Sequence, residues 1–192
     1  KLSMAKKTAS AIPTSQTTVV DDVLRRPAEE DHALELLALQ QNDQDPRPAS
    51  WLLSPRAVLA YVIGREPLTA TIDGKKQLVP IGRKFFGDTA LVERAIVTLA
   101  SERALLLLGE PGTGKSWLSE HLAAAICGTS VLVIQGTAGT TEDHIKYSWN
   151  IARVIAEGPR ADNLIPSPTM QAMRRAKPLS FTSRRRRGLR HS

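Results

Sequence analysis

The residues with the clearest chemical potential form one glycine-rich segment, Gly109-Glu110-Pro111-Gly112-Thr113-Gly114-Lys115-Ser116. The segment fits the G-x-x-x-x-G-K-[ST] phosphate-binding pattern at every fixed position. Glycine suits such a loop because a Cβ would hold the backbone away from phosphate oxygens, and because tight turns use positive φ. The backbone N–H groups of residues 112–116 can then converge on a polyphosphate. We therefore predict a nucleotide-binding loop here.

Two side chains complete this chemistry. Lys115 is expected to bridge the β- and γ-phosphates, and the Ser116 hydroxyl to complete a Mg²⁺ shell, so the predicted cofactors are ATP and Mg²⁺. Trp117, the next residue, is either part of the nucleotide site or an anchor in the core or an interface. A glycine-rich turn with an incidental lysine would carry the same letters. The predicted binding residues are Gly109, Glu110, Pro111, Gly112, Thr113, Gly114, Lys115, Ser116 and Trp117, with Ser116 as the metal ligand.

The elements around the loop favour an α/β fold. Residues 104–108 are an uninterrupted apolar run, which is typical of a strand buried on both faces of a parallel sheet. A helix is expected from about Lys115 to Cys127, stopped by Gly128, and residues 131–135 form a second β-branched strand. Strand, helix and strand predict a right-handed βαβ unit. The predicted fold class is a three-layer α/β P-loop NTPase core.

The chain divides by composition into four parts. Residues 1–26 lack an apolar face and are expected to be mobile, and residues 174–192 form a basic, disordered tail. Residues 27–83 predict a small domain of two helices and a hairpin, and residues 84–173 the P-loop core. In the small domain, the first helix should turn Leu34, Leu37 and Ala38 to one face. Ser54-Pro55 begins a buried helix that runs to Ile63, and Asp73-Gly74 is the hairpin turn.

Three further helices are predicted in the core. Asp88 caps a helix that runs to about Leu99, and Ser167-Pro168 begins a short helix that reaches Ala176. Residues 143–156 have helical apolar spacing, although the preceding residues 139–141 are also compatible with the start of a hairpin.

The charge of the chain is concentrated at one end. The 192 residues include 26 Lys+Arg and 19 Asp+Glu, a net charge of +7. Residues 174–192 contain eight of these bases and no acid, so the remaining 18 bases and 19 acids nearly balance. Residues 184–187, four consecutive arginines, would suit nucleic-acid phosphates, or they belong to an unstructured or out-of-frame end. Nothing in the sequence positions them as arginine fingers.

Several other residues have a structural and a functional interpretation. Glu142 and Asp143 either cap a helix or stand in for catalytic acids. The lone His121 is typical of a structural or solvent-facing histidine, and Lys75 and Lys76 fit either an exposed hairpin tip or the wing of a DNA reader. The single cysteine, Cys127, predicts a reducing compartment, and no apolar run reaches the ~20 residues of a bilayer span. We expect a soluble, cytoplasmic protein.

The segment from Phe86-Gly87-Asp88 through the helix to Leu99 and the loop 105–116 resembles the opening of a bacterial MoxR-type AAA+ ATPase. The resemblance spans roughly residues 86–173. It implies ring-forming, often hexameric subunits that hydrolyse ATP to remodel or mature partner proteins, frequently beside a von Willebrand factor A domain protein. Its site residues carry over to Gly109, Gly112, Gly114, Lys115 and Ser116.

The sequence departs from this family in its second acidic motif. One carboxylate of that motif helps to hold Mg²⁺ and the next activates water. The motif is due near residues 177–181, where Ser180-Phe181-Thr182-Ser183 runs into arginines. We therefore expect the first half of an AAA+ module, which binds nucleotide but turns it over poorly, and its catalytic residues are unknown. The alternatives are a nucleic-acid-binding adaptor that uses the hairpin and the tail, or an inactive assembly fragment.

Overall fold

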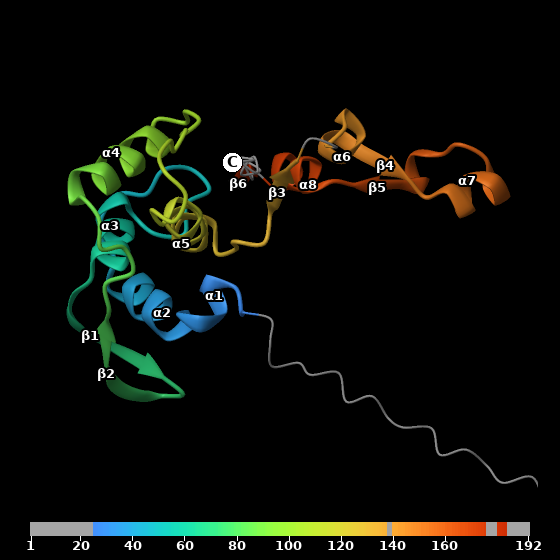
Figure 1. Ribbon diagram of the computed structural model, residues 1–192. Coiled ribbons are helices and arrows are strands. Elements are labelled where there is room, and N and C mark those ends of the chain that lie inside the picture. Colours follow the sequence, from blue (N-terminus) through green and yellow to red (C-terminus); the bar gives the residue numbers. More distant parts are fainter. Residues whose placement is uncertain (1–24, 138–139, 176–179, 184–192) are drawn as a thin grey trace, which may run out of the picture.

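The computed structural model describes residues 25–137, 140–175 and 180–183. Within these ranges the chain forms a helical body with one hairpin, and an arm that projects from it (Figure 1). Most of the predicted N-terminal segment, 1–26, and most of the predicted basic tail, 174–192, lie outside the described residues. None of the helices in the described ranges combines the length and apolar character that a bilayer span requires.

Two short helices open the body, α1 (Ala28–Asp31) and α2 (Ala33–Asn42). The chain bends between them at His32, with φ −116° and ψ 24°. Because α2 starts afresh after this bend, it turns Leu36 and Leu39 inward, while Leu34 is 53% exposed. The predicted face of Leu34, Leu37 and Ala38 is therefore wrong for Leu34, although Ala38 is buried.

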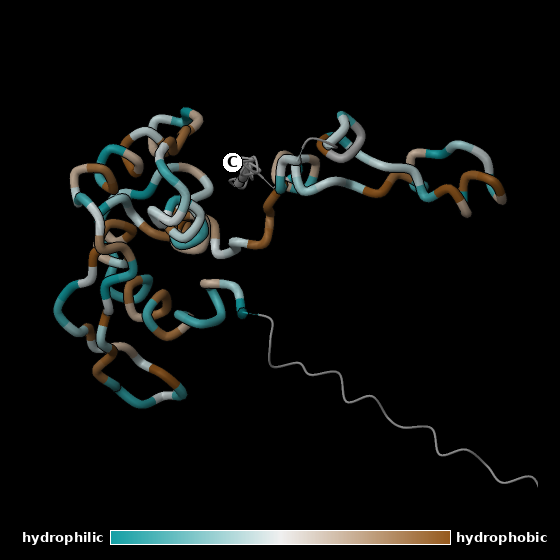
Figure 2. The backbone as a smooth tube through the Cα atoms, viewed as in Figure 1, coloured by the Kyte–Doolittle hydropathy of each residue, from teal (hydrophilic) through white to brown (hydrophobic). Residues whose placement is uncertain are grey.

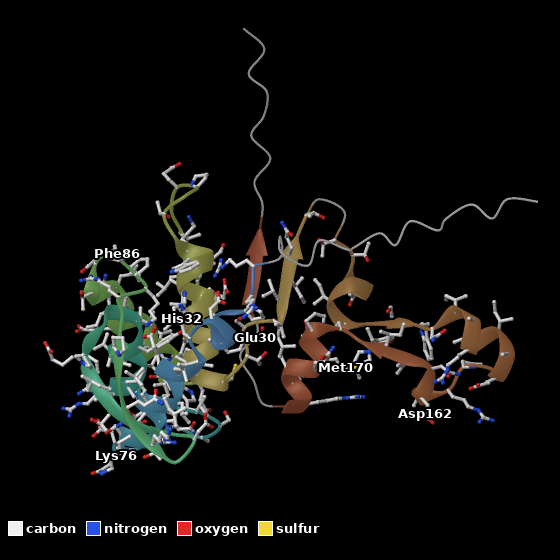
Figure 3. All side chains as sticks on the ribbon, turned by 90° about the horizontal axis from the view of Figure 1, so that it is seen from below. Glu30, His32, Lys76, Phe86, Asp162 and Met170 are labelled. Carbon is white, nitrogen blue, oxygen red and sulfur yellow. The ribbon has the colours of Figure 1, made fainter. Side chains whose placement is uncertain are left out.

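The next three elements confirm the prediction of a buried helix followed by a hairpin. Helix α3 (Pro55–Ile63) begins at Ser54, whose Oγ accepts a hydrogen bond from the Ala57 N–H at 3.2 Å, and it buries Val58, Tyr61 and Val62. Strands β1 (Arg65–Ile72) and β2 (Lys75–Ile81) pair antiparallel across Asp73-Gly74, which has φ of 50° and 76°. Figure 3 shows Lys76 on this hairpin at one end of the molecule and Asp162 on the arm at the other.

Helices α4 (Thr89–Ala100) and α5 (Lys115–Cys127) complete the body. The Asp88 carboxylate caps α4 by accepting from the Ala90 N–H at 3.0 Å, and Gly128 ends α5 with φ 69°. Both boundaries were predicted. The core lies where these helices meet α2, α3 and the hairpin, and its largest fully buried apolar side chains are Tyr61, Leu39, Leu53, Leu118 and Ile126.

The predicted buried strand at residues 104–108 is wrong. The segment forms neither helix nor strand in the described part of the chain, and its side chains alternate between exposed and partly buried. Leu105 and Leu107 pack against the core, whereas Leu106 is 78% and Leu108 is 83% exposed. Alternate side chains of an extended segment point to opposite faces, and here only one face meets the helices. The predicted βαβ unit around this segment is therefore absent from the described residues.

A parallel pair forms instead between β3 (Val133–Gly136) and β6 (Ser180–Ser183), in register from Val133↔Ser180 to Gly136↔Ser183. Strand β3 overlaps the predicted second strand. Strand β6 lies where the second acidic motif was expected. The described fold is thus a mixture of helices and small sheets, with one parallel pair of the kind expected in an α/β domain.

The chain between these two strands builds the arm (Figure 1). The predicted helix over residues 143–156 is wrong as one element, because the strand β4 (Tyr147–Trp149) interrupts it. Asn150 then caps a new helix by accepting from the Arg153 N–H at 3.2 Å. Strand β4 pairs antiparallel with β5 (Leu164–Pro166), and the start of α8 (Pro168–Arg175) confirms the Ser167-Pro168 signal. The elements of the arm are α6 (Glu142–Lys146), β4 (Tyr147–Trp149), α7 (Ile151–Glu157), the 3₁₀ turn η1 (Ala161–Asn163), β5 (Leu164–Pro166) and α8 (Pro168–Arg175).

The arm leaves apolar side chains uncovered. Helix α7 has no buried residue, and its Ile151 and Ile155 are exposed. Figure 2 shows hydrophobic positions at the outer end of the arm as well as inside the body. A continuous helix over 143–156 is excluded because residues 147–149 pair as a strand with residues 164–166.

The orientation of α2 is tested by two truncations on the same helix. Leu39→Ala removes a side chain that is 1% exposed, and we expect the free energy of unfolding to fall by about 2–5 kcal/mol. Leu34→Ala removes an exposed side chain and should change the free energy of unfolding by less than about 0.5 kcal/mol. Urea titrations followed by circular dichroism measure both. A larger loss for Leu34→Ala would contradict the observed face.

Candidate nucleotide-binding site

The glycine-rich loop joins the extended segment to the N-terminus of α5. Gly112 has φ 86° and Gly114 has φ 75°, in the left-handed region that residues with a Cβ rarely adopt. A Cβ on Gly114 would also touch the ring of Phe85, which packs at 3.5 Å from that position. No heavy atom lies within 4 Å of a Cβ built on Gly112, so this side of the loop is open. The two glycines therefore have the backbone conformation that the motif predicted.

The backbone of this loop presents unused donors. Within the described ranges, no backbone N–H group of residues 112–117 donates a hydrogen bond. Those of residues 115–117 belong to the first turn of α5, where no intrahelical acceptor exists, and the helix dipole adds a partial positive charge. Such a set of donors fits the oxygens of a phosphate chain.

The Lys115 ammonium lies across the loop. Its Nζ donates to the Glu110 carbonyl oxygen at 2.6 Å and to Thr113 Oγ1 at 3.0 Å. Thr113 Oγ1 also donates to the Glu110 carbonyl at 2.9 Å, so the loop closes on itself through three polar groups. A bound phosphate would offer the ammonium a charged acceptor in place of a neutral one, which gives the stronger hydrogen bond.

The Ser116 hydroxyl is exposed and opens into a cavity of about 410 Å³. No group of three or more His, Cys, Asp or Glu side chains in the described part of the chain is arranged to hold a metal. Mg²⁺ commonly reaches such sites with the substrate phosphates and needs few protein ligands. The single hydroxyl therefore fits a metal that arrives with the nucleotide, rather than a resident ion.

The Trp117 side chain contacts the linker after β2 and the start of the described chain. Its Nε1 donates to the Lys84 carbonyl oxygen at 2.7 Å, and the Arg25 guanidinium stacks 4.0 Å from its ring centroid. This geometry corresponds to the anchor interpretation. Together with Phe85, which contacts Gly114, the Trp117 hydrogen bond fixes the linker after β2 against the start of α5.

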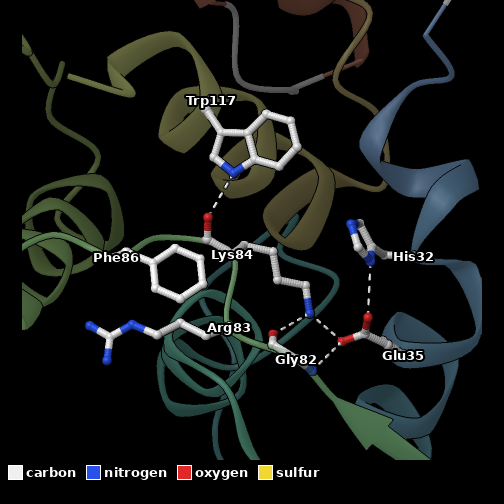
Figure 4. A pocket seen from close by; sticks show the side chains of 7 residues that line it. All are labelled: His32, Glu35, Gly82, Arg83, Lys84, Phe86 and Trp117. Carbon is white, nitrogen blue, oxygen red and sulfur yellow. Dashed lines mark hydrogen bonds and ion pairs between the residues drawn. The ribbon is translucent and has the colours of Figure 1, made fainter. Parts of the chain in front are cut away.

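The buried Lys84 and the partly buried Glu35 form an ion pair that the sequence did not indicate (Figure 4). The Lys84 side chain is 3% exposed and donates to the Glu35 carboxylate and to the Gly82 carbonyl. The other carboxylate oxygen lies 2.9 Å from His32 Nδ1. Burial lowers the pKa of Lys84, and Glu35 opposes that shift. The two residues are 49 positions apart, and no local pattern could have paired them.

His121 lies on α5 beside His32, with the two ring centroids 5.3 Å apart. It is fully buried, and its Nδ1 lies 3.0 Å from the Tyr61 hydroxyl. Burial, followed by the charges of His32, Lys84 and Arg25, lowers the pKa of His121 to about 3. The ring is therefore neutral at physiological pH and has a structural role, as one of the two interpretations held.

Residues 104–182 match an AAA domain of the dynein-related subfamily. The matched segment begins before the glycine-rich loop, includes the whole arm and ends within β6. It supports a nucleotide-binding P-loop domain of the AAA+ type for this part of the chain. The match does not distinguish the MoxR type from other AAA+ proteins.

One relative extends the match beyond that domain. The chain is 46% identical over 157 residues to the uncharacterized protein YehL of Escherichia coli (strain K12). The alignment covers 82% of this chain but only 40% of YehL, so the chain spans less than half of that protein's length. No solved structure matches the chain.

Of the two acidic candidates, Glu142 and Asp143, the structure describes the side chain of Glu142. Glu142 is exposed and pairs with Lys146 on α6, which lowers the pKa of Glu142. The Asp143 side chain lies outside the described set. Among the residues that line the cavity beside Ser116, the one acid is Glu120, whose Oε1 lies 2.9 Å from the Arg25 guanidinium.

The buried His121 predicts a pH dependence of stability. An unfolded histidine titrates near 6.5, while the folded ring stays neutral down to about 3, so protons bind the unfolded chain first as the pH falls. Stability is fully present above pH 6.5 and is lost below it by up to ~1.4 kcal/mol per pH unit. Relative to His121→Gln, we expect the parent to lose about 2 kcal/mol between pH 6.5 and 5 in urea titrations. A pH-independent difference would contradict this.

Proposed function

We propose that this chain binds ATP with Mg²⁺ through residues 109–116. The observation that carries the proposal is the run of unused N–H donors at residues 112–117, at the N-terminus of a thirteen-residue helix. Lys115 adds a cation and Ser116 a hydroxyl at the same place. Phosphate is the anion that this combination fits best, because it offers many charged oxygens at short spacing.

The finer assignment is to the MoxR type of AAA+ ATPase. Phe86-Gly87-Asp88 and α4 precede the loop in the order that this family shows, and the AAA domain match supports the wider class. On this assignment, the whole protein forms rings, hydrolyses ATP to remodel or mature partner proteins, and works beside a von Willebrand factor A domain protein. We place it in the cytoplasm, since the single Cys127 cannot form an internal disulfide.

Hydrolysis by this chain alone is expected to be weak. Water attack needs a carboxylate that can orient or activate the nucleophile. Glu120, the one acid that lines the cavity beside Ser116, is engaged by Arg25. The sequence of β6 (Ser180–Ser183) contains no acidic residue. The residues at the loop thus support binding more strongly than turnover.

Nucleotide binding is tested with the full chain and a fluorescent ATP analogue in the presence of Mg²⁺. Lys115→Ala removes the ammonium of the loop and should weaken binding at least tenfold, or about 1.4 kcal/mol. Lys76→Ala, on the exposed hairpin tip, removes a lysine of equal charge far from the loop and should bind as the parent does. Equal affinities of the parent and Lys115→Ala would refute the proposal.

Turnover is tested separately with the same proteins. Phosphate release by the parent chain should not exceed that of Lys115→Ala, because the loop residues can bind the substrate without activating water. A steady-state rate that depends on Lys115 would show that a catalytic acid is present after all.

A further inference from the structure

The cavity beside Ser116 has a second wall that comes from the start of the described chain. On α5, Ser116 and Glu120 are four residues apart and face the same side. Opposite them lies the segment that leads into α1. The residues that line the cavity are Arg25, Arg26, Pro27, Ser116, Glu120, Ser130, Val131, Val133 and Gln135.

Two sets of contacts hold this segment in place. Arg25 Nη2 lies 2.9 Å from Glu120 Oε1, and the same guanidinium stacks on Trp117. At the other end, the Glu29 carboxylate accepts from the Ser130 N–H at 2.9 and 3.0 Å and from the Ser130 hydroxyl at 2.6 Å. The segment is thus fixed to α5 on one side and to the chain before β3 on the other.

Arg26 remains as the uncompensated charge. The charges of Arg25 and Glu120 cancel each other, and no other ionisable side chain lines the cavity. Arg26 is exposed and has no hydrogen bond or ion pair with the described residues. The side chains that line the cavity therefore sum to one positive charge, next to the hydroxyl that is expected to hold Mg²⁺, while the Glu29 carboxylate is engaged by Ser130.

We propose that Arg26 binds the terminal phosphate of a nucleoside triphosphate held in the same chain, and that Arg25 is its positioning residue. This inference rests on the proposed function. A guanidinium offers a planar fork of donors that matches phosphate oxygens. The cavity, at about 410 Å³ against ~30 Å³ for one water, has room for a phosphate group with its metal and waters.

The location of the cavity predicts selectivity for the triphosphate. The Ser116 hydroxyl would hold the Mg²⁺ that accompanies the β- and γ-phosphates. Of the loop residues 109–116, Ser116 is the one that lines this cavity, and Arg26 lines the same cavity. A diphosphate fills the loop, and only a triphosphate extends to Arg26. Arg26 therefore distinguishes ATP from ADP, while Lys115 serves both.

The experiment compares ATP and ADP affinities in the full chain with Mg²⁺ present, by titration of fluorescent analogues of both nucleotides. Arg26→Ala should weaken ATP about tenfold and ADP less than twofold, and Arg26→Lys should fall between this variant and the parent. Arg160→Ala, an exposed arginine on the arm, is the matched control and should change neither affinity. Arg25→Ala should lower the ATP-to-ADP affinity ratio by a smaller factor.

The outcomes separate the two proposals. Parent binding that Lys115→Ala abolishes, together with unchanged ATP affinity in Arg26→Ala, overturns the role of Arg26 and leaves the loop assignment intact. If Arg26→Ala lowers the ATP and ADP affinities by equal factors, the proposed selectivity for the triphosphate is overturned. If Arg25→Ala lowers the ATP and ADP affinities by equal factors, the positioning role of Arg25 is overturned, because a structural defect would weaken the binding of both nucleotides alike. A parent chain that binds neither nucleotide overturns both proposals.

Discussion

The buried ammonium of Lys84 joins the parts of the body that no sheet connects. Its Nζ reaches Glu35 on α2 and lies 4.5 Å from the ring centroid of Tyr61 on α3, while its carbonyl accepts from Trp117 on α5. A buried ion pair is weak evidence of net stabilisation, but removal of one partner leaves an uncompensated charge, at a cost of ~3–5 kcal/mol. One lysine thus contacts residues of three helices, in addition to the apolar core between them.

The position of the phosphate loop depends on this centre. Trp117 follows Ser116 in the sequence, so the hydrogen bond from Trp117 to Lys84 fixes the first turn of α5. The ring of Phe85, the residue after Lys84, packs against Gly114, at 3.5 Å from the position of a Cβ there. The backbone donors of the loop are thus oriented by contacts with the small N-terminal helices and the linker, and the residues before α1 reach the same site through Arg25.

The elements that could be predicted from the sequence are those whose signals are local. Ser54, Asp88 and Ser167 each cap a helix within three residues of themselves, and Asp73-Gly74 sets its own backbone geometry. The loop conformation at Gly112 and Gly114 could be predicted for the same reason, because the residues that define the motif lie within a few positions of one another.

The features that could not be predicted depend on partners far along the chain. An apolar run such as residues 104–108 has the same letters whether one or two faces are covered, and only the fold shows that Leu106 and Leu108 remain exposed. The pairing of Lys84 with Glu35 and the approach of Arg26 to the Ser116 cavity span 49 and about 90 positions, respectively. Residues 143–156 have helical spacing, yet residues 147–149 within them pair as a strand with residues 164–166, which lie outside that range.

The pairing of β4 with β5 makes the outer arm a modular insertion. Tyr147 and Pro166 lie opposite each other in the antiparallel pair, with Cα atoms typically ~5 Å apart in such a ladder. The chain therefore comes back beside Tyr147 nineteen residues later, at Pro166. We expect the distance between β3 and β6 to be independent of the residues between Tyr147 and Pro166. The length and composition of this excursion can vary, by deletion or by exchange with another hairpin, without a change in the parallel pair that it interrupts.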